Sequence, residues 1–185
     1  MIGKISDIPR DVGIQKQLTD MHVKEWFESD VFHFRWWLLI FLVIAMLLIW
    51  WRLLDKSRIF EISLFAILSA IVFMGVHEYG EELVLWEYPT DLIPIFPPLS
   101  SFNLVGLPFA YSLVYQRFGR RKSFLCAAVI TTAFICFLIE PLLSWGGFYC
   151  LLHWNYFFSA VIYFTVTVIV RAVIKRIYAI AKQAE

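Results

Sequence analysis

Five long apolar runs, joined by loops whose charge alternates sharply, constrain the fold of this chain most strongly. The first, third and fifth runs are each followed by clustered Lys and Arg, whereas residues 77–100 and 141–153 contain neither. The basic residues after the three runs are Arg52, Lys56, Arg58, Arg117, Arg120, Arg121, Lys122, Arg171, Lys175, Arg176 and Lys182. Because positive loops are retained on the cytoplasmic side during insertion, this alternation predicts an all-α integral membrane protein with its N-terminus outside and its C-terminus in the cytoplasm.

The overall composition favours the same class. Of the 185 residues, 61% are hydrophobic and 18% are aromatic, whereas about half of the residues of a soluble domain are apolar. The formal net charge is only +1, and the basic residues are concentrated where a membrane requires them. The composition therefore indicates a lipid bilayer, and no nucleic acid, as the chain's surroundings.

The apolar runs predict a five-transmembrane-helix bundle within a membrane domain at 32–177. The expected spans are 34–53, 59–77, 100–116, 123–143 and 154–174. The polar tail at 1–31 is expected to form a short interfacial helix on the outer face, and 178–185 a basic cytoplasmic tail. Within the first span, the pairs Trp36-Trp37 and Trp50-Trp51 lie fourteen positions apart. At 1.5 Å per residue that is about 21 Å, which fits the two interfacial aromatic belts.

The loops carry further local predictions. Four prolines, at 89, 94, 97 and 98, exclude a continuous helix across residues 83–99. This Pro-rich extracytoplasmic loop is still apolar and aromatic, so it either lies on the outer surface of the bundle or dips shallowly between helices. At the opposite side, Glu61 is placed to pair with Arg58, three residues earlier. The three cysteines are too far apart along the fourth helix and its loop to form disulfides with one another.

Acidic residues gather toward the outer ends of the second and fourth spans. Glu78 and Glu81 follow the second span, Glu140 lies near the end of the fourth, and Arg35 begins the first at the same level. An ionised carboxylate inside a helix bundle costs several kcal/mol unless it is paired, hydrogen-bonded or protonated. The residues therefore predict either an outward-facing site for a cation, a proton or a polar ligand, or a structural ion pair that joins the helices. Trp86 and Tyr88 either cover this site or serve as interfacial aromatics.

A metal site is a weaker interpretation of the same region. His77 and Glu81 are four residues apart, hence on one helix face, and His153 or Glu140 would have to complete a ligand set. The second imidazole of an H-E-x-x-H motif is absent. The alternative is an interfacial histidine beside solvated acids, and we expect no cofactor.

Several landmarks together resemble a known family. They are Trp36-Trp37, Leu54-Asp55-Lys56 with Glu61, Gly80-Glu81, Trp86-x-Tyr88-Pro89, Pro94, Pro97, Tyr115-Gln116-Arg117-Phe118, Glu140-Pro141, Gly147-x-Tyr149 and Trp154-x-Tyr156-x-x-Ser159. Over about 32–177, the chain resembles the CBO-type multi-spanning membrane proteins of spore-forming Firmicutes, although His77-Glu78 stands where that pattern has an Asp. The resemblance implies a plasma-membrane protein of a Gram-positive cell and carries no activity, substrate or cofactor.

Two functional hypotheses follow. The first is a non-enzymatic membrane component, namely a subunit, a sensor or a transport-related protein that works through the outward-facing acidic site. Its partners would be the lipid bilayer and another membrane protein or a second copy of the chain. The second is a membrane-embedded enzyme acting on lipid or isoprenoid substrates, with Glu140 or His77 as the acid or base. No nucleophile motif or phosphate-binding glycine loop supports catalysis.

Overall fold

The computed structural model describes residues 10–94 and 102–183, which are almost entirely helical. In chain order the elements are α1 (Arg10–Glu25), the π-helical turn η2 (Trp26–Asp30), α2 (Phe34–Leu53), the 3-10 turn η3 (Lys56–Arg58), α3 (Ile59–Glu82), β1 (Trp86–Glu87), the π-helical η4 (Phe102–Gly106), α4 (Leu107–Arg117), α5 (Arg121–Phe134), the π-helical η5 (Ile135–Ile139), α6 (Glu140–Trp145), β2 (Cys150–Leu151) and α7 (Tyr156–Ala181). Pro97 and Pro98 of the predicted loop, and the first two residues of the predicted span 100–116, lie outside the described residues.

Four helical segments are long and apolar enough to cross a membrane. They are Phe34–Leu53, Lys56–Glu82, Arg121–Trp145 and Tyr156–Ala181. They correspond to the first, second, fourth and fifth predicted spans, so the all-α membrane class of the chain is confirmed. The third predicted span, 100–116, corresponds in its described part to the five residues of η4 and the eleven of α4, which are shorter than the other segments.

The bounds of the long helices differ from those predicted, mainly at their ends. The helix of the second predicted span, α3, continues beyond His77 to Glu82, and α7 ends at Ala181 rather than at residue 174. Charged residues interrupt the hydropathy in both extensions, but Glu, Lys and Arg are good helix formers, so hydropathy alone does not detect the helix that continues through them. As a result Glu78 and Glu81 lie on a helix rather than in a loop.

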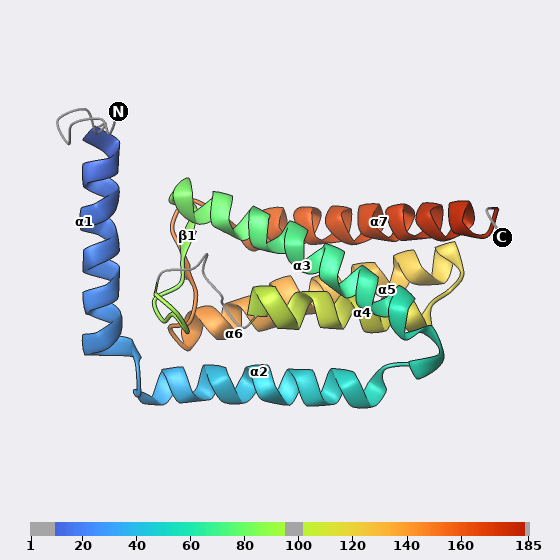
Figure 1. The fold of residues 1–185 in the computed structure, drawn as a ribbon, viewed down its shortest axis with the longest axis horizontal. Helices are drawn as coiled ribbons and strands as arrows, with labels where there is room; N and C mark the ends of the chain where they lie inside the picture. The colour runs from blue at the N-terminus through green and yellow to red at the C-terminus, as the bar shows by residue number, and fades with distance from the viewer. Residues whose placement is uncertain (1–9, 95–101, 184–185) are drawn as a thin grey trace, which may run out of the picture.

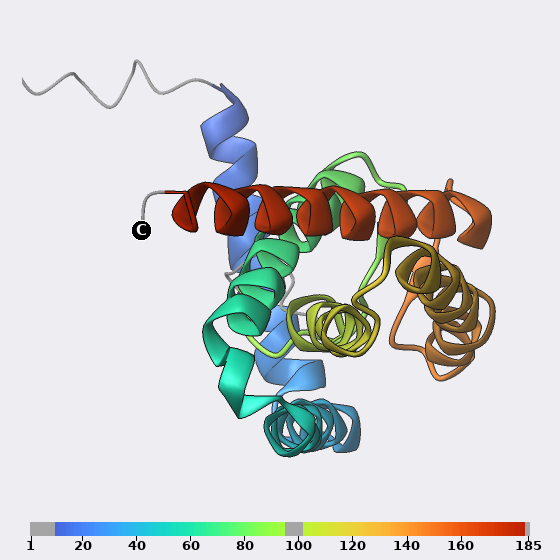
Figure 2. The ribbon, with the colours of Figure 1, turned by 90° about the vertical axis from the view of Figure 1, so that its right-hand side faces the viewer.

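The helices run back and forth between two ends of the bundle (Figure 1). We call the end that holds residues 54–58, residues 118–120 and the last turns of α7 the basic end, and the end that holds residues 83–94 and 146–155 the acidic end. In Figure 2, α2, α4 and α5 are seen nearly end-on, whereas α7 crosses them at a steep angle. The helix α1 stands perpendicular to α2 in both views, as expected for a helix that lies along a membrane surface.

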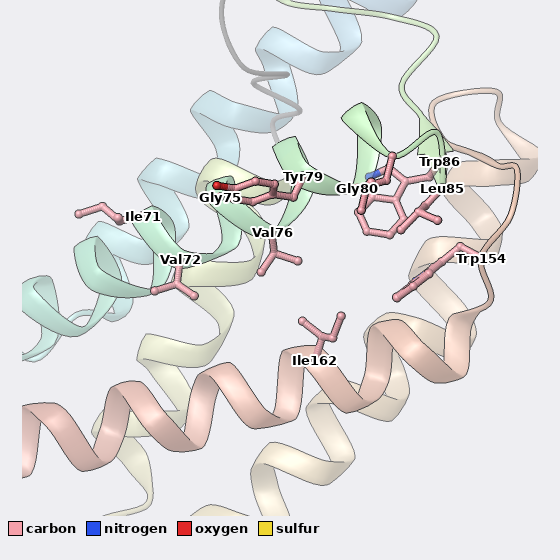
Figure 3. A pocket seen from close by; sticks show the side chains of 11 residues that line it. Ile71, Val72, Gly75, Val76, Tyr79, Gly80, Leu85, Trp86, Trp154 and Ile162 are labelled. Carbon is pink, nitrogen blue, oxygen red and sulfur yellow. The ribbon is translucent and has the colours of Figure 1, made fainter.

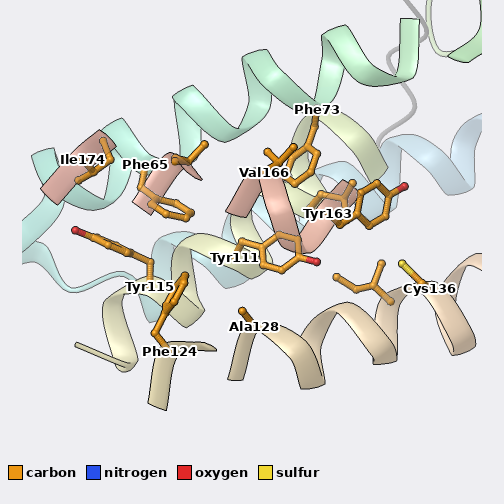
Figure 4. Close-up of a cluster of buried hydrophobic side chains, with 13 residues drawn as sticks. Phe65, Phe73, Tyr111, Tyr115, Phe124, Ala128, Cys136, Tyr163, Val166 and Ile174 are labelled. Carbon is orange, nitrogen blue, oxygen red and sulfur yellow. The ribbon is translucent and has the colours of Figure 1, made fainter. Parts of the chain in front are cut away.

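Aromatic side chains fill the centre of the bundle between α3, α4, α5 and α7 (Figure 4). The ring of Phe65 stacks on Tyr115 with centroids 4.6 Å apart, and Phe73 meets Tyr163 edge-on at 5.5 Å. The Tyr111 hydroxyl bonds the Thr132 hydroxyl at 2.7 Å. Such packing and interhelical hydrogen bonds, each worth about 1 kcal/mol, hold helices together in lipid, where burial from water does not.

At the acidic end, a short antiparallel ladder fixes the loop that follows α3. Trp86 pairs with Leu151 and Glu87 with Cys150, so β1 and β2 join two loops that are distant in sequence. Trp86, Tyr88 and Thr90 are buried, whereas the alternate residues Glu87 and Pro89 are exposed. The described part of the Pro-rich loop is therefore extended, with alternate side chains packed against the end of the bundle.

Two local predictions from the sequence can be compared with the structure. The Glu61–Arg58 pair is confirmed, with a carboxylate oxygen 2.9 Å from the guanidinium. All three cysteines are free, as expected; Cys136 is buried, and Cys126 and Cys150 are exposed.

Candidate functional site

His77 lies at the centre of a buried polar cluster at the acidic end. The side chain projects from α3 and is only 3% exposed. The Tyr88 hydroxyl lies 2.6 Å from Nδ1 and the Tyr163 hydroxyl 3.2 Å from Nε2. In a neutral imidazole one ring nitrogen donates and the other accepts, and a phenol can do either. The two tyrosines therefore satisfy both nitrogens in either tautomer, and neither nitrogen is free for a metal ion.

Glu140 is buried a short distance away, on the far side of Tyr163. It begins α6, directly after the π-helical turn η5, and is 2% exposed. The hydroxyls of Tyr163 and Ser159 are its polar neighbours. Neither carboxyl oxygen has a hydrogen bond of ordinary geometry within the described residues. Because a charge in such surroundings costs several kcal/mol, this carboxyl group must acquire a proton or a cation, or find a partner by a small movement.

Tyr163 connects the carboxyl group to the histidine. The residue lies on α7 one turn after Ser159, on the same helix face, so both hydroxyls are directed at the region of Glu140. Ser159 also accepts a hydrogen bond from the Trp154 indole at 3.1 Å. The resulting order is Glu140, Tyr163, His77 and Tyr88, a series of groups that can each give or take a proton and that leads from α6 to the loop after α3 at the acidic end.

Aromatic rings cover this cluster at the acidic end of the bundle. Trp86 is 3% exposed, and its ring lies 5.6 Å from that of His77 and 5.1 Å from that of Trp154. Its six-membered ring lies directly on Gly80, where an added Cβ would come within 1.8 Å of it. Tyr149 stacks on Tyr88 at 5.3 Å. The cluster is therefore capped by packed side chains, and its tight packing favours a proton over a larger ligand.

The predicted cation partner does not join the carboxylates. Arg35 is exposed, and its guanidinium lies over the Phe148 ring at 5.8 Å and against Gly147, which has φ +74°. Among the described residues, none of the ion pairs includes Arg35, Glu78 or Glu140. Arg35, Glu78 and Glu140 thus all lie toward the acidic end of the bundle, but the predicted structural ion pair between them is not formed in the described residues.

The remaining predicted residues are dispersed. Glu78 and Glu81 are half-buried on α3, and one Glu78 oxygen lacks a hydrogen-bond partner within the described part of the chain. His153 lies in the loop before α7, where its Nδ1 is 3.2 Å from the Val84 carbonyl oxygen. Across residues 10–94 and 102–183, no three His, Cys, Asp or Glu side chains are arranged to hold a metal ion, so the geometry does not assemble His77, Glu81 and His153.

A second pair of carboxylates lies in the loop region outside the spans. The Asp91 amide is 3.3 Å from an oxygen of Asp30, and the Trp26 indole donates to the Asp91 carbonyl at 2.9 Å. Burial, with Asp30 and then Glu87 nearby, raises the pKa of Asp91 to about 7. Burial also raises the pKa of Asp30, while its hydrogen bond from the Asp91 amide opposes the rise. These contacts join the corner between α1 and α2 to the loop after α3.

Glu61, at the basic end, shows how this bundle treats a carboxylate that serves structure. It lies 2.9 Å from Arg58 and 3.6 Å from Lys175, and it accepts a hydrogen bond from the Tyr115 hydroxyl. The carboxylate thereby joins α3, α4 and α7 with two cations and a phenol. Glu140 is more deeply buried than Glu61 and has no cation in contact among the described residues.

An apolar groove runs beside the cluster, between the halves of α3 and α7 that are nearer the acidic end (Figure 3). It has a volume of about 430 Å³. Its lining includes Val72, Val76, Gly80, Trp86, Trp154 and Ile162. Among the residues that line it, Tyr79 is the one with a titratable side chain. The indole of Trp86 separates the groove from His77.

Sequence reasoning assigned Glu140, His77, Trp86 and Tyr88 to a site. It named Ser159 and Tyr149 as landmarks of the resemblance without a role in the site, and it missed Tyr163. Ser159 and Tyr163 have a signal that could have revealed them, because polar residues four apart in an apolar span share one face. Tyr149 has no such signal, since its place depends on the ladder between β1 and β2.

By length and composition of its helices, the chain is a polytopic membrane protein. Comparison with protein-family models, with curated proteins and with solved structures yielded no match.

Proposed function

We propose that this chain is a non-enzymatic component of the plasma membrane that binds a proton at Glu140 and senses or couples to the pH outside. In this proposal the chain crosses the membrane five times, with α4 and η4 as the third crossing, and the acidic end faces outward. The alternation of basic loops supports that direction. The plasma-membrane location rests on the proposed membership of the CBO-type family.

The observation that carries the proposal is the contrast between two carboxylates in one bundle. Glu61 is paired with two cations, whereas Glu140 is 2% exposed and has none in contact among the described residues. A carboxylate kept in a dry site without a counter-ion is destabilising for the fold, and intramembrane residues of this kind mark proton or ion sites. A proton is the ligand that fits, since aromatic side chains pack the space around the group.

The neighbouring groups offer a way to transmit the change. Protonation turns a carboxylate from an acceptor into a donor, and Tyr163 can reverse its hydroxyl accordingly. Because Tyr163 also bonds His77, and His77 bonds Tyr88 in the outer loop, the reversal reaches the loop held by β1. A partner membrane protein, or a second copy of the chain, would detect the altered loop.

Infrared difference spectroscopy across a pH titration tests the proposal on the full chain in lipid nanodiscs. The wild-type protein should show the C=O band of a protonated carboxyl that disappears as the pH rises. Glu140→Gln should remove part of that band while it retains its circular dichroism spectrum and unfolding temperature, and Asp91→Asn should remove the separate part contributed by Asp91, whose pKa burial raises to about 7. Glu28→Gln, whose carboxylate is exposed beside Lys24, should retain the band. A band of unchanged intensity in Glu140→Gln, or a wild-type protein without one, would refute the proposal.

The groove beside α3 provides the specific observation for a second candidate, an enzyme acting on lipid or isoprenoid chains. Its volume and apolar lining suit an acyl or isoprenyl chain. However, Trp86 stands between the groove and His77, and Glu140 is not in its lining. The candidate requires Trp86 to move, so a turnover of added lipid that is abolished by His77→Gln would support the enzyme against the proton site.

A further inference from the structure

A second groove, at the basic end, combines positive charge with an apolar floor. It lies between the first turns of α5 and residues 168–175 of α7 and has a volume of about 540 Å³. Its rim carries Arg121, Arg171 and Lys175, and its floor includes Leu125, Val168 and Ala172. The lining contains no acidic side chain. Arg117 at the end of α4, Arg120 in the loop and Lys122 at the start of α5 are close in sequence to Gly119 and Arg121 and add to the positive potential.

The position of Arg171 is fixed by protein contacts. Its Nη2 donates to the Gly119 carbonyl at 2.6 Å, and its guanidinium lies over the Phe124 ring at 4.1 Å. A guanidinium held this way has remaining donors directed elsewhere and loses little entropy when it binds an anion. Lys175 shares Glu61 at 3.6 Å, but half of its side chain stays exposed. Arg121 is exposed at the start of α5.

We propose that this groove binds one anionic phospholipid, with its phosphate at the three cations and an acyl chain along the apolar floor. Charge complementarity selects the headgroup, since three cations and no acid line the site. The floor selects a lipid over a free phosphate ion, because half-buried Val168 and exposed Ala172 offer an apolar surface that suits an acyl chain and not an inorganic ion. The proposal depends on insertion of the bundle in a membrane but not on proton binding at Glu140.

The test uses native mass spectrometry of the full chain extracted from nanodiscs that contain phosphatidylglycerol and phosphatidylcholine. The wild-type protein should retain one phosphatidylglycerol in preference to phosphatidylcholine. Arg121→Gln removes one rim charge without a described structural contact, and we expect it to lower that preference about fivefold, since each basic residue near such a surface is worth about 1 kcal/mol. The matched control is Arg176→Gln, which removes the same charge from an exposed neighbouring position outside the lining.

Three outcomes would overturn the proposal. Equal retention of the two lipids would show that no headgroup is selected. An equal loss in Arg176→Gln would indicate diffuse attraction by the whole basic end rather than a site. Complete displacement of the lipid by inorganic phosphate would assign the groove to a free anion. Circular dichroism of both variants verifies that they fold.

Discussion

Gly80 provides a sharp test of how Trp86 covers the buried polar cluster around His77. An added Cβ at this position would lie 1.8, 2.2 and 2.3 Å from three ring atoms of Trp86, well inside van der Waals contact. The ring cannot swing aside easily, because His77 and Trp154 pack against it. Gly80→Ala must therefore displace Trp86 or shift α3 away from the loop.

The expected cost can be bracketed. A small adjustment of an overpacked site costs about 1–3 kcal/mol. Expelling a 3% exposed Trp side chain forfeits the burial of about 150–250 Å², or about 4–6 kcal/mol at 25 cal/mol per Å². Alanine regains about 1 kcal/mol of helix propensity. We expect Gly80→Ala to lower the free energy of unfolding by about 2–4 kcal/mol.

Chemical unfolding in detergent micelles, followed by circular dichroism, measures this difference. Gly75→Ala is the matched control, because it lies on the same helix and an added Cβ there meets nothing within 4 Å. The control should be neutral or slightly more stable than the wild type. If the two variants were equally stable, Trp86 would not be packed on Gly80, and the account of the closed cluster would be wrong.

Three further predictions concern other parts of the chain. Stability should fall as the pH rises from about 4 to about 7, because burial beside Asp30 and Glu87 lets folded Asp91 keep a proton that the unfolded chain has lost. The unfolding temperature of Asp91→Asn should decline less than that of the wild type over that window, and an equal decline would contradict the assignment. Glu61→Gln should lower the free energy of unfolding by about 2–3 kcal/mol by leaving Arg58 and Lys175 uncompensated, whereas Glu28→Gln, an exposed pair at 3.9 Å, should change it by less than about 0.5 kcal/mol. A membrane-impermeant maleimide should label exposed Cys150 in intact cells but leave buried Cys136 unmodified, and protection of Cys150 would reverse the proposed topology.

The long helices could be predicted because hydrophobic length and loop charge are local properties. The bounds of α2, Phe34–Leu53, match the prediction. The ends of α3 and α7 could not be read in this way, because helix continues into polar residues wherever backbone hydrogen bonds are available. The segment that contains α4 was recognised as apolar, but its π-helical start at Phe102–Gly106 depends on packing against α2 and α3.

The candidate site was only partly accessible to the same reasoning. Glu140 is identifiable because a carboxylate within an apolar run is costly wherever it lies. Its surroundings depend on which faces of α3 and α7 meet, and the steep crossing of α7 has no sequence signature. Arg35 was assigned as a counter-ion from its level alone, yet its guanidinium lies against Gly147 and Phe148. The depth of a residue in a membrane can thus be estimated from sequence, whereas the direction in which its side chain points around the helix axis cannot.

The π-helical turn η5 has a consequence for how Glu140 came to be buried. The Glu140 amide bonds the Ile135 carbonyl, five residues back, so the segment holds one residue more than a regular helix would need. Each residue advances an α-helix by about 100°. Deleting lipid-facing Phe137, which is 55% exposed, would rewind the segment and rotate the carboxyl group toward the hydrocarbon. One extra residue in the π-helical turn thus determines which face of the helix carries this acid.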